Sequence, residues 1–395
     1  SVRNPPRNGA RRCPPVWGER LNADRQGRAC TTCTPAGLRC GVMNGRAACS
    51  LTFAANLAVV ATLAGCCPEL WYEATEPEPV VRLPQDEAPH HCGGIEWWYY
   101  TGLVETDDDL QFGIEAVVFH VPPVPLLLAE EGWAAHFAVL DVQTGVFVYD
   151  EYLGFTPPTF GGTETGGFAL DLPLVSLTGG GGDDHVVAAL PDGSFALDLT
   201  LTDRRGAVLH SDGGYVPFGG PREVFYYSRP QMAAVGTLSI DGESHEVTGA
   251  FWFDRQWGRD LLNPWKRWDW YSVRLDDGER IMLYVIRETP AVAFGTYIPP
   301  AGEPVELTDA DFSIEVTADW TSPHTGRVYP VTWEIALPEY QLTLDVSAVT
   351  ADQEIDARRS TLNVYWEGLC TVAGQRGDAP VGGHAYVEIT NTERP

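Results

Sequence analysis

Beyond residue 85 the sequence predicts an all-β protein. Apolar and polar residues alternate in short runs, among them LQFGIEAVVFH, FALDLTLTD, VTGAFWF and YSVRLDDGERIMLYVI, and a period of two is typical of antiparallel strands. Asp-Gly pairs at Asp192, Asp241 and Asp277 separate such runs and supply the positive φ angles that tight hairpin turns require. Because no stretch of this region keeps a helical period over three turns, we expect β-barrels or β-sandwiches.

This predicted β-region divides into two barrel-sized halves. The Gly- and Pro-rich segment GGPREVFYYSRPQMAAVGTLSIDG lies near its middle, and a new hairpin begins at Gly236. We therefore predict an N-terminal domain over residues 85–235 and a C-terminal domain over residues 236–395. The tract TGGGGDD (178–184) is interpreted as a flexible loop within the first domain.

The first 84 residues differ from the rest of the chain. Residues 1–50 hold nine arginines against two acidic residues, whereas the whole chain has a net charge of −28. The apolar run over residues 51–66 has the length of a signal-peptide core and ends in Leu-Ala-Gly-Cys, which resembles the lipobox of bacterial lipoproteins. We predict lipidation at Cys66, a linker over residues 67–84 and an exported protein that is anchored in the bacterial cell envelope. Residues 1–50 are interpreted as a doubtful extension or, alternatively, as a small cysteine-containing segment.

Composition and motifs exclude several functions. The strongly acidic chain contains a single lysine, so binding to nucleic acid through phosphates is not expected. The G-x-S-x-G, P-loop, dinucleotide-binding and H-E-x-x-H motifs are missing, and we expect no cofactor and no metal. His90 and His91 stand before Cys92 and leave metal binding open as a weaker interpretation. A disulfide between Cys92 and Cys370 is a further hypothesis if the compartment is oxidising.

The stretch FWFDRQWGRDLLNPWKRWDWY (251–271) combines five tryptophans with three aspartates. A wall of aromatic rings around a few polar groups suits a long apolar ligand. A buried aspartate in such a wall has a raised pKa, so it stays protonated and can protonate an alkene. Aromatic faces would stabilise the carbocation until water adds to it. The alternative interpretation is that these are core and turn residues and that Asp254 and Arg255 form an ordinary ion pair.

Several phrases, taken together, resemble the family of carotenoid 1,2-hydratases and AttH proteins. IEWWYYTGLVE and LQFGIEAVVF are similar to the family's first strand pair. YYSRPQM, GAFWFDRQWG and RWDWYSVRLDDGERIMLYVIR are similar to its middle block, and YWEGLCTVAG with GGHAYVEIT to its closing strands. The resemblance runs from about residue 85 to the end of the chain. It implies two lipocalin-like antiparallel β-barrels packed together, with a hydrophobic pocket near their junction.

The resemblance also implies site residues. Asp254, Trp257, Asp269 and Tyr284 match the family's general pattern, and we predict Asp254 or Asp269 as the proton donor. Arg255 stands where the hydratases carry a histidine, and a cation there would lower the pKa of Asp254, which favours Asp269 as the acid or no acid at all. The predicted substrate-binding residues are Glu96, Trp97, Tyr99, Tyr227, Arg229, Arg255, Trp257, Trp268, Trp270, Tyr284 and Arg287.

We therefore predict a protein that holds an isoprenoid or another long apolar molecule between two barrels. If the protein is an enzyme, the expected reaction is acid-promoted hydration or cyclisation of an alkene. The alternatives are a non-catalytic carrier or envelope lipoprotein, and a structural surface protein that has no pocket. The expected partners are the apolar small molecule and, through Cys66, the membrane.

Overall fold

The computed structural model describes the chain in several stretches, all within one compact unit, Thr62–Pro395. The described residues are 80–90, 94–121, 131–156, 166–218, 224–258, 261 and 266–390. The predicted extension (1–50), the predicted signal peptide with Cys66 and most of the predicted linker lie outside the described residues. The described helices are single 3-10 turns, η2 (Gln85–Glu87) and η4 (Pro338–Tyr340). No helix among the described residues has the length and apolar character needed to span a membrane.

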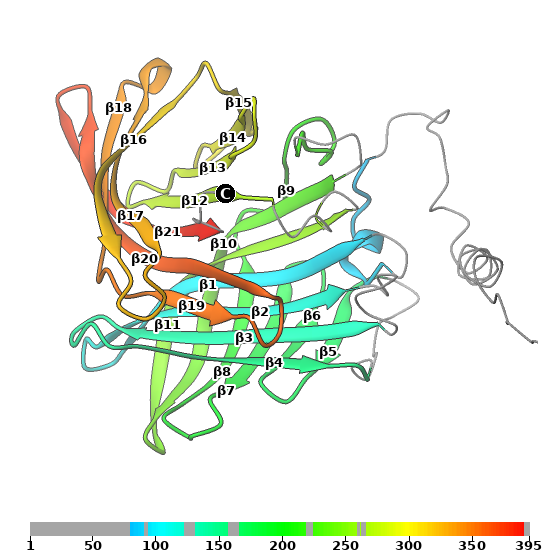
Figure 1. Ribbon diagram of the computed structural model, residues 1–395. Coiled ribbons are helices and arrows are strands. Elements are labelled where there is room, and N and C mark those ends of the chain that lie inside the picture. The colour runs from blue at the N-terminus through cyan, green and yellow to red at the C-terminus, as the bar shows by residue number, and fades with distance from the viewer. Residues whose placement is uncertain are drawn as a thin grey trace, which may run out of the picture. The chain divides into compact units, whose positions relative to one another are not determined.

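The first sheet, called sheet A, contains the eleven strands of the N-terminal part (Figure 1). These strands are β1 (Ile95–Thr106), β2 (Gln111–Val121), β3 (Gly132–Asp141), β4 (Phe147–Gly154), β5 (Phe168–Asp171), β6 (Val175–Gly179), β7 (Asp183–Ala189), β8 (Phe195–Asp203), β9 (Val208–Leu209), β10 (Val224–Ile240) and β11 (Glu243–Gly258). Their spatial order is β4-β3-β2-β1-β11-β10-β8-β7-β6-β5, and β9 pairs with β10. All the pairs are antiparallel, and β1, β11 and β10 lie in the middle of the sheet.

The second sheet, called sheet B, contains the ten strands of the C-terminal part. These strands are β12 (Trp268–Leu275), β13 (Arg280–Ile286), β14 (Val292–Ile298), β15 (Val305–Thr308), β16 (Ser313–Thr321), β17 (Val328–Leu337), β18 (Leu342–Ala348), β19 (Glu354–Ala357), β20 (Asn363–Arg376) and β21 (Ala379–Thr390). Their order is β15-β14-β13-β12-β21-β20-β18-β17-β16, and β19 pairs with β20. The two curled antiparallel sheets confirm the predicted all-β, double lipocalin-like fold class.

The central strands are buried on both faces, which explains why their sequences are apolar almost throughout. In β1, Trp98 and Tyr100 pack into a core enclosed by sheet A, whereas Tyr99 packs into a second core that also contains Trp270 and Tyr284 of sheet B. Successive side chains of a strand point to opposite faces, so one strand serves two cores. Sheet B encloses a third core of its own. The core shared by the two sheets surrounds the site described below.

Gly113 of β2 lets the two sheets approach closely. A Cβ atom at this position would lie 2.8 Å from the Tyr386 hydroxyl oxygen and 3.1 Å from a methyl carbon of Leu369, both in sheet B. Contacts this short are not tolerated between unbonded heavy atoms unless a neighbour moves. The sequence therefore needs glycine here to bring β2 against β20 and β21.

The three Asp-Gly pairs do lie between strands, but their turns differ. At Asp241-Gly242 both residues have positive φ, 49° and 87°, and β10 and β11 are joined by these two residues alone. This is the predicted two-residue hairpin. Asp192-Gly193 and Asp277-Gly278 occupy longer loops, in which only the glycine has positive φ. The predicted glycine loop lies between β6 and β7, where Gly180, Gly181 and Gly182 all have positive φ.

The chain passes from sheet A to sheet B later than predicted. Residue 235 lies inside β10, and both β10 and β11 belong to sheet A, so the change of sheet falls between Gly258 and Trp268. The pairing of β10 with β11 shifts register between Arg229 and Met232. Pro230 and Gln231 are the two residues at this irregularity. A proline and an irregularity of this kind are compatible with one continuous strand, because a bulge accommodates the missing N–H group. The glycines and prolines used to predict a linker therefore belong partly to a bulged strand.

Cys370 of β20 is a buried free thiol. The hypothesis that Cys370 forms a disulfide with Cys92 is therefore wrong for this structure, and Cys92 itself lies outside the described residues.

Candidate active site

A cavity of about 390 Å³ lies among side chains of both sheets. Strands β1, β2, β3, β4 and β11 of sheet A contribute to it, as do β12, β13, β20 and β21 of sheet B and the loop between β19 and β20. Much of its wall is aromatic, and these rings are Trp97, Tyr99, Phe119, Trp268, Trp270, Tyr284 and Tyr365. Three carboxyl groups also line it, those of Glu115, Asp254 and Glu388. The cavity therefore combines an apolar surface with a few acidic groups.

Strand alternation decides which side chains reach the cavity. In β11, Asp254 and Gln256 line the cavity, whereas Arg255 between them faces the core of sheet A. In β12, Trp268 and Trp270 line it, whereas Asp269 between them does not. The period of two along each strand produces both patterns.

Asp254 accepts three hydrogen bonds within the shared core. The Tyr226 hydroxyl donates to one carboxylate oxygen at 2.6 Å, and the Trp252 indole N–H donates to the other at 2.6 Å. The Ser228 hydroxyl also donates to Asp254, and Ser228 is in turn bonded to a ring nitrogen of His210 at 2.6 Å. Burial raises the pKa of Asp254 to about 7, although the three donors act in the opposite direction. Asp254 can therefore gain or lose a proton near neutral pH.

Glu388 of β21 lies opposite Trp270 in the β12–β21 register. It accepts one hydrogen bond, from the Trp268 indole N–H at 3.1 Å. Burial raises the pKa of Glu388 to about 7, and the charges of Asp254 and Asp269 add to this effect. One donor stabilises an anion less than three do, so Glu388 is less well prepared than Asp254 to hold a negative charge.

Glu115 of β2 is the most strongly perturbed of the three lining acids. One of its oxygens lies 2.9 Å from the Tyr365 hydroxyl, and the other has no hydrogen-bond partner. Burial raises the pKa of Glu115 to about 8, and the negative charge of Glu388 contributes to this shift. Behind the wall, Glu367 accepts a 2.5 Å hydrogen bond from Tyr99, and burial raises its pKa well above the usual range. At neutral pH Glu115 is therefore a neutral carboxylic acid in the cavity wall.

Residues 74–392 match the model of the family described as AttH-like. The chain belongs to the AttH-like family. A solved structure of a candidate AttH from Nitrosomonas europaea is 28% identical, with a TM-score of 0.72, and the match covers 82% of this chain and 100% of that one. The crystal structure of kievitone hydratase from Nectria haematococca is 19% identical, with a TM-score of 0.64, and the match covers 80% and 95% of the two chains. This second likeness shows the fold.

A relative of the AttH-like protein is the dehydratase asqC of Emericella nidulans, which is 23% identical over 204 residues. The match covers 49% of this chain and 57% of that relative, so the chain spans little more than half the length of this curated protein.

The structure of the AttH-like protein brings six of the predicted site residues to the cavity and leaves the others elsewhere. The six that line it are Trp97, Tyr99, Asp254, Trp268, Trp270 and Tyr284. The predicted residues that are absent from its lining are Glu96, Tyr227, Arg229, Arg255, Trp257, Asp269 and Arg287.

Arg255 does not set the charge of Asp254 as predicted. Its guanidinium lies 3.8 Å from the centre of the Trp98 ring and donates to Glu96 at 2.5 Å, on the opposite face of the sheet. Arg255 and the hydrogen bonds from His120 and His90 hold the pKa of Glu96 well below its usual range despite complete burial. The argument that Arg255 lowers the pKa of Asp254, and so favours Asp269 as the acid, is therefore wrong.

Asp269 and Arg287 form an ion pair at 3.2 Å. Burial raises the pKa of Asp269 to about 6, and Arg287 opposes that shift. On the other side of sheet A, Arg229 is paired with Glu87 at 2.5 Å and with Asp203 at 2.7 Å. These charged groups are engaged with each other and away from the cavity.

The remaining predicted residues belong to the core of sheet A. Tyr227 and Trp257 are both members of that core. Trp257 stacks on His90, with ring centres 4.5 Å apart, and the His90 ring bonds Glu96 at 2.9 Å. Among the described residues no group of three or more His, Cys, Asp or Glu side chains could hold a metal ion. His91 and Cys92 lie outside those residues.

Sequence reasoning missed Glu115, Glu388, Tyr365 and His136. Each of the two glutamates is a single acidic residue within an otherwise apolar run, FGIEAVVF and AYVEIT. A lone carboxyl in a strand that is buried on both faces has to be protonated or paired, and this was the available signal.

Proposed function

We propose that this AttH-like protein adds water to, or removes water from, a carbon–carbon double bond of an apolar molecule bound in the cavity. The observation that carries the proposal is the aromatic wall with three carboxyl groups whose pKa values lie at or above neutrality. Acids in this range can donate a proton at neutral pH, and their conjugate bases can accept one. The relatives named as a hydratase and a dehydratase support reactions of the same type.

In this proposal Glu115 is the acid and Asp254 is the base. Glu115 keeps its proton at neutral pH, and its second oxygen has no partner within the protein. In hydration its O–H bond breaks and a C–H bond forms, which leaves a carbocation on the substrate. A water oxygen then bonds to the cation, and the released proton goes to Asp254, whose three donors favour the ionised form. Dehydration follows the same steps in reverse, so the two groups exchange roles.

The aromatic rings stabilise the intermediate. A cation over the face of a tryptophan or tyrosine gains about 0.5–1 kcal/mol at an exposed site, and about 2 kcal/mol or more when water is excluded. Trp97 and Trp268 stack with centres 6.3 Å apart, and Tyr99 meets Trp270 edge to face at 5.5 Å. These rings hold one another in position and can offer a preformed wall to the cation.

The cavity volume limits the substrate. At about 390 Å³ it lies towards the lower end of the range of roughly 300–1,000 Å³ for small-molecule sites. This size favours a compact terpenoid or polyketide-like alkene, or one end of a longer isoprenoid such as a carotenoid. A non-catalytic carrier of the same molecules is the second candidate, and the same aromatic lining favours it.

The test is turnover by the purified full-length protein in ¹⁸O-labelled water. A panel of terpenoid alkenes, polyenes and their tertiary alcohols is incubated at neutral pH and analysed by mass spectrometry. We expect the gain of one ¹⁸O-labelled water by an alkene or the loss of one water from an alcohol. Glu115→Gln and Asp254→Asn should each lower the rate by about 10²–10⁴-fold, the usual contribution of a positioned acid or base.

Asp184→Asn provides a matched control. Asp184 is also a buried aspartate with a pKa raised to about 6, and it also accepts a hydrogen bond from a tyrosine, Tyr100, at 2.9 Å. It does not line the cavity, so the variant should keep the wild-type rate. Recovery of every panel compound unchanged would reject the hydratase proposal in favour of the carrier. A rate that falls in Asp269→Asn but not in Glu115→Gln or Asp254→Asn would restore the acid predicted from the sequence.

A further inference from the structure

Next to Glu115 a series of hydrogen bonds runs through side chains of the cavity wall. The Tyr365 hydroxyl lies 2.9 Å from Glu115 and 2.7 Å from Nδ1 of His136. His136 is completely buried, and burial lowers its pKa to about 3, so its ring is neutral. A neutral imidazole carries one N–H and one bare nitrogen, so it can accept a proton on one side and release one on the other.

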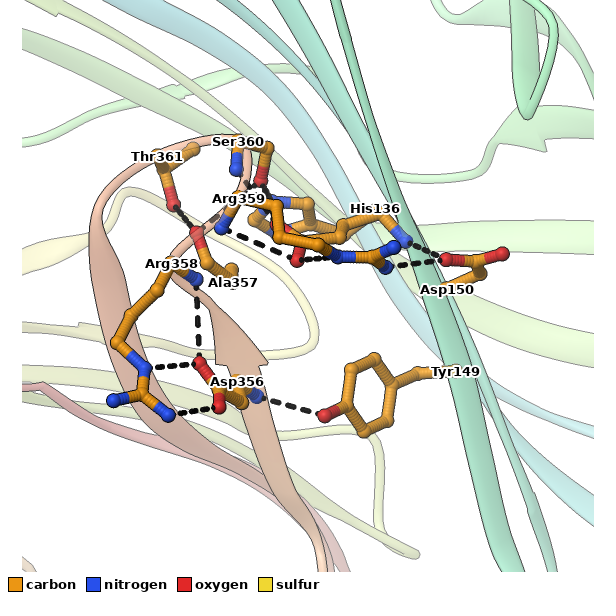
Figure 2. Close-up of polar contacts among 10 residues, drawn as sticks. His136, Tyr149, Asp150, Asp356, Ala357, Arg358, Arg359, Ser360 and Thr361 are labelled. Carbon is orange, nitrogen blue, oxygen red and sulfur yellow. Dashed lines mark hydrogen bonds and ion pairs between the residues drawn. The ribbon is translucent and has the colours of Figure 1, made fainter. Parts of the chain in front are cut away.

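The series continues into the loop between β19 and β20 (Figure 2). Nε2 of His136 lies 2.9 Å from the Ser360 hydroxyl, and that hydroxyl donates to Glu151 of β4. The Ser360 backbone N–H also donates to Glu151, at 2.8 Å. Arg359 donates to the other oxygen of Glu151 at 2.7 Å, and its side chain is 75% exposed. The series therefore ends beneath a charged side chain at the surface.

Two arrangements of the protons satisfy every contact in the series. In the first, Glu115 is protonated on the oxygen that faces Tyr365 and donates to it, and Tyr365 donates to Nδ1 of His136; rotation of the carboxyl group turns this proton towards the substrate. The Nε2 proton of His136 then points to Ser360, and the Ser360 hydroxyl donates to the Glu151 carboxylate. In the second arrangement each of these bonds is reversed, so Glu115 is ionised and Glu151 carries the proton. The raised pKa of Glu115 and the arginine beside Glu151 both favour the first arrangement.

We propose that the hydrogen-bonded series from Glu151 to Glu115 is a proton relay that restores the proton which Glu115 gives to the substrate. The inference rests on the proposed function, because it assumes that Glu115 loses a proton during the reaction. An apolar ligand in the cavity excludes water from Glu115, whereas the relay reaches this group through side chains of the wall and begins at Glu151, which does not line the cavity. His136, Tyr365 and Ser360 thereby act through Glu115 as positioning residues for its proton.

The relay conserves protons at every step. Once Glu115 has lost its proton, Glu151 takes one from solvent when the exposed Arg359 side chain moves, the hydroxyl groups rotate and the His136 proton changes from Nε2 to Nδ1. Glu151 then gives its proton to Ser360, and Ser360 gives its own hydroxyl proton to Nε2 of His136. The Nδ1 proton of His136 moves to Tyr365, and the Tyr365 hydroxyl proton moves to Glu115. Each intermediate group gains one proton and loses one, so all three end neutral. Glu151 ends as the carboxylate of the first arrangement, in which the series began.

The loop that completes the relay and the strand before it, β19, are held against sheet A by other contacts. Arg359 donates to Asp150 at 2.9 Å, and the backbone N–H of Asp356 donates to the Tyr149 hydroxyl at 3.0 Å (Figure 2). Both partners belong to β4, next to Glu151 in the sequence. These bonds fix the distance between Ser360 and His136, on which proton transfer depends.

The experiment follows deuterium exchange of the Glu115 carboxyl by rapid-mixing infrared spectroscopy on the full-length protein with the cavity filled by a saturated terpenoid alkane, which keeps water from Glu115 and cannot accept its proton. The band of the protonated carboxyl is assigned by its disappearance in Glu115→Gln. We expect Ser360→Ala, which interrupts the relay, to slow exchange by about tenfold, the ratio that corresponds to a barrier higher by about 1.4 kcal/mol. Tyr365→Phe interrupts the relay at its other end and should slow the exchange by a similar factor. With two variants, the test stays valid if one of them does not fold.

Two references separate the relay from other causes. Glu388 lines the same cavity, so its exchange reports the entry of water through the cavity and should not change in Ser360→Ala. Ser322→Ala is the matched control, because the Ser322 hydroxyl donates to the buried Glu354 at 2.5 Å and neither residue lines the cavity. Equal exchange rates of Glu115 in the wild type and in both relay variants would overturn the relay. Because no substrate is used, a slowed exchange stands even if the turnover assay fails.

Discussion

Replacing Asp254 with asparagine should change the pH dependence of stability in a defined direction. Asparagine has nearly the same volume, and its amide oxygen can still accept from Trp252 while its NH2 group faces the Tyr226 hydroxyl oxygen. It cannot titrate. The difference in unfolding free energy between the variant and the wild type therefore isolates the ionisation of this one group from all others in the protein.

The magnitude follows from the environment of Asp254. Burial raises its pKa from 3.8 to about 7 in the folded protein. Below pH ~4 the Asp254 carboxyl is protonated in both the folded and the unfolded protein, so its ionisation costs the wild type no unfolding free energy. As the pH rises towards 7, the unfolded chain releases this proton while the folded protein keeps it, so folding becomes less favourable. At roughly 1.4 kcal/mol per pKa unit, the wild type loses about 4 kcal/mol of unfolding free energy by pH 7. Above the folded pKa this loss stays constant, because Asp254 is then ionised in both states.

Urea unfolding of both proteins at a series of pH values tests this reasoning. We expect the stability of Asp254→Asn relative to the wild type to increase by about 4 kcal/mol between about pH 4 and pH 7, and to level off above that. Asp184→Asn should show a smaller increase, about 3 kcal/mol, because the pKa of Asp184 is raised only to about 6. A flat difference for Asp254→Asn across this window would mean that the carboxyl is ionised in the folded protein, and the proposed acid–base chemistry would lose its basis.

Three further predictions concern other parts of the molecule. Gly113→Val should lower the unfolding free energy by about 1–3 kcal/mol in urea titrations, because a side chain there collides with Tyr386; unchanged stability would disprove the close approach of the sheets. Arg255→Leu should cost about 3–5 kcal/mol, measured in the same way, since Glu96 would be left buried without its cation, and a neutral result would contradict their pairing. Expression of the full chain in a bacterium with labelled palmitate should label the protein but not its Cys66→Ser variant, and label in neither would refute lipidation.

The fold could be predicted because its main signals are local. Alternation with a period of two and the Asp-Gly pairs indicate antiparallel strands without knowledge of distant contacts. The site was harder, because the central strands are buried on both faces. In β11 the apolar and polar residues FWFDRQW give no indication of which alternate set faces the second sheet. Asp254 was therefore chosen together with its neighbour Arg255, although the two lie on opposite faces.

The missed residues depend on contacts between segments far apart in the sequence. Tyr365 meets Glu115 across 250 positions, and His136 meets Ser360 across 224. Each is a single polar side chain in an apolar strand or a short loop, and such residues are common in cores that have nothing to do with catalysis. Only the packing of β20 and its loop against sheet A turns them into one connected group.

Two buried glutamates of sheet A show how the same side chain acquires opposite properties. Glu96 in β1 and Glu115 in β2 are both completely buried. Arg255 and two histidine rings face Glu96, and its pKa is held far below the usual range. Glu115 instead faces Tyr365 and the acidic Glu388, so burial raises the pKa of Glu115 to about 8.

The contrast between Glu96 and Glu115 distinguishes a charged group that stabilises the fold from the acid that we propose for catalysis. A buried anion that is matched to a cation can stabilise the fold only while both remain charged, so it has no proton to offer at neutral pH. A buried acid that faces a hydroxyl group and another acid keeps its proton and must be supplied with a new one after each transfer. The side of sheet A that carries Arg255 therefore serves the core, and the opposite side, where His136 and Tyr365 meet Glu115, is suited to move protons.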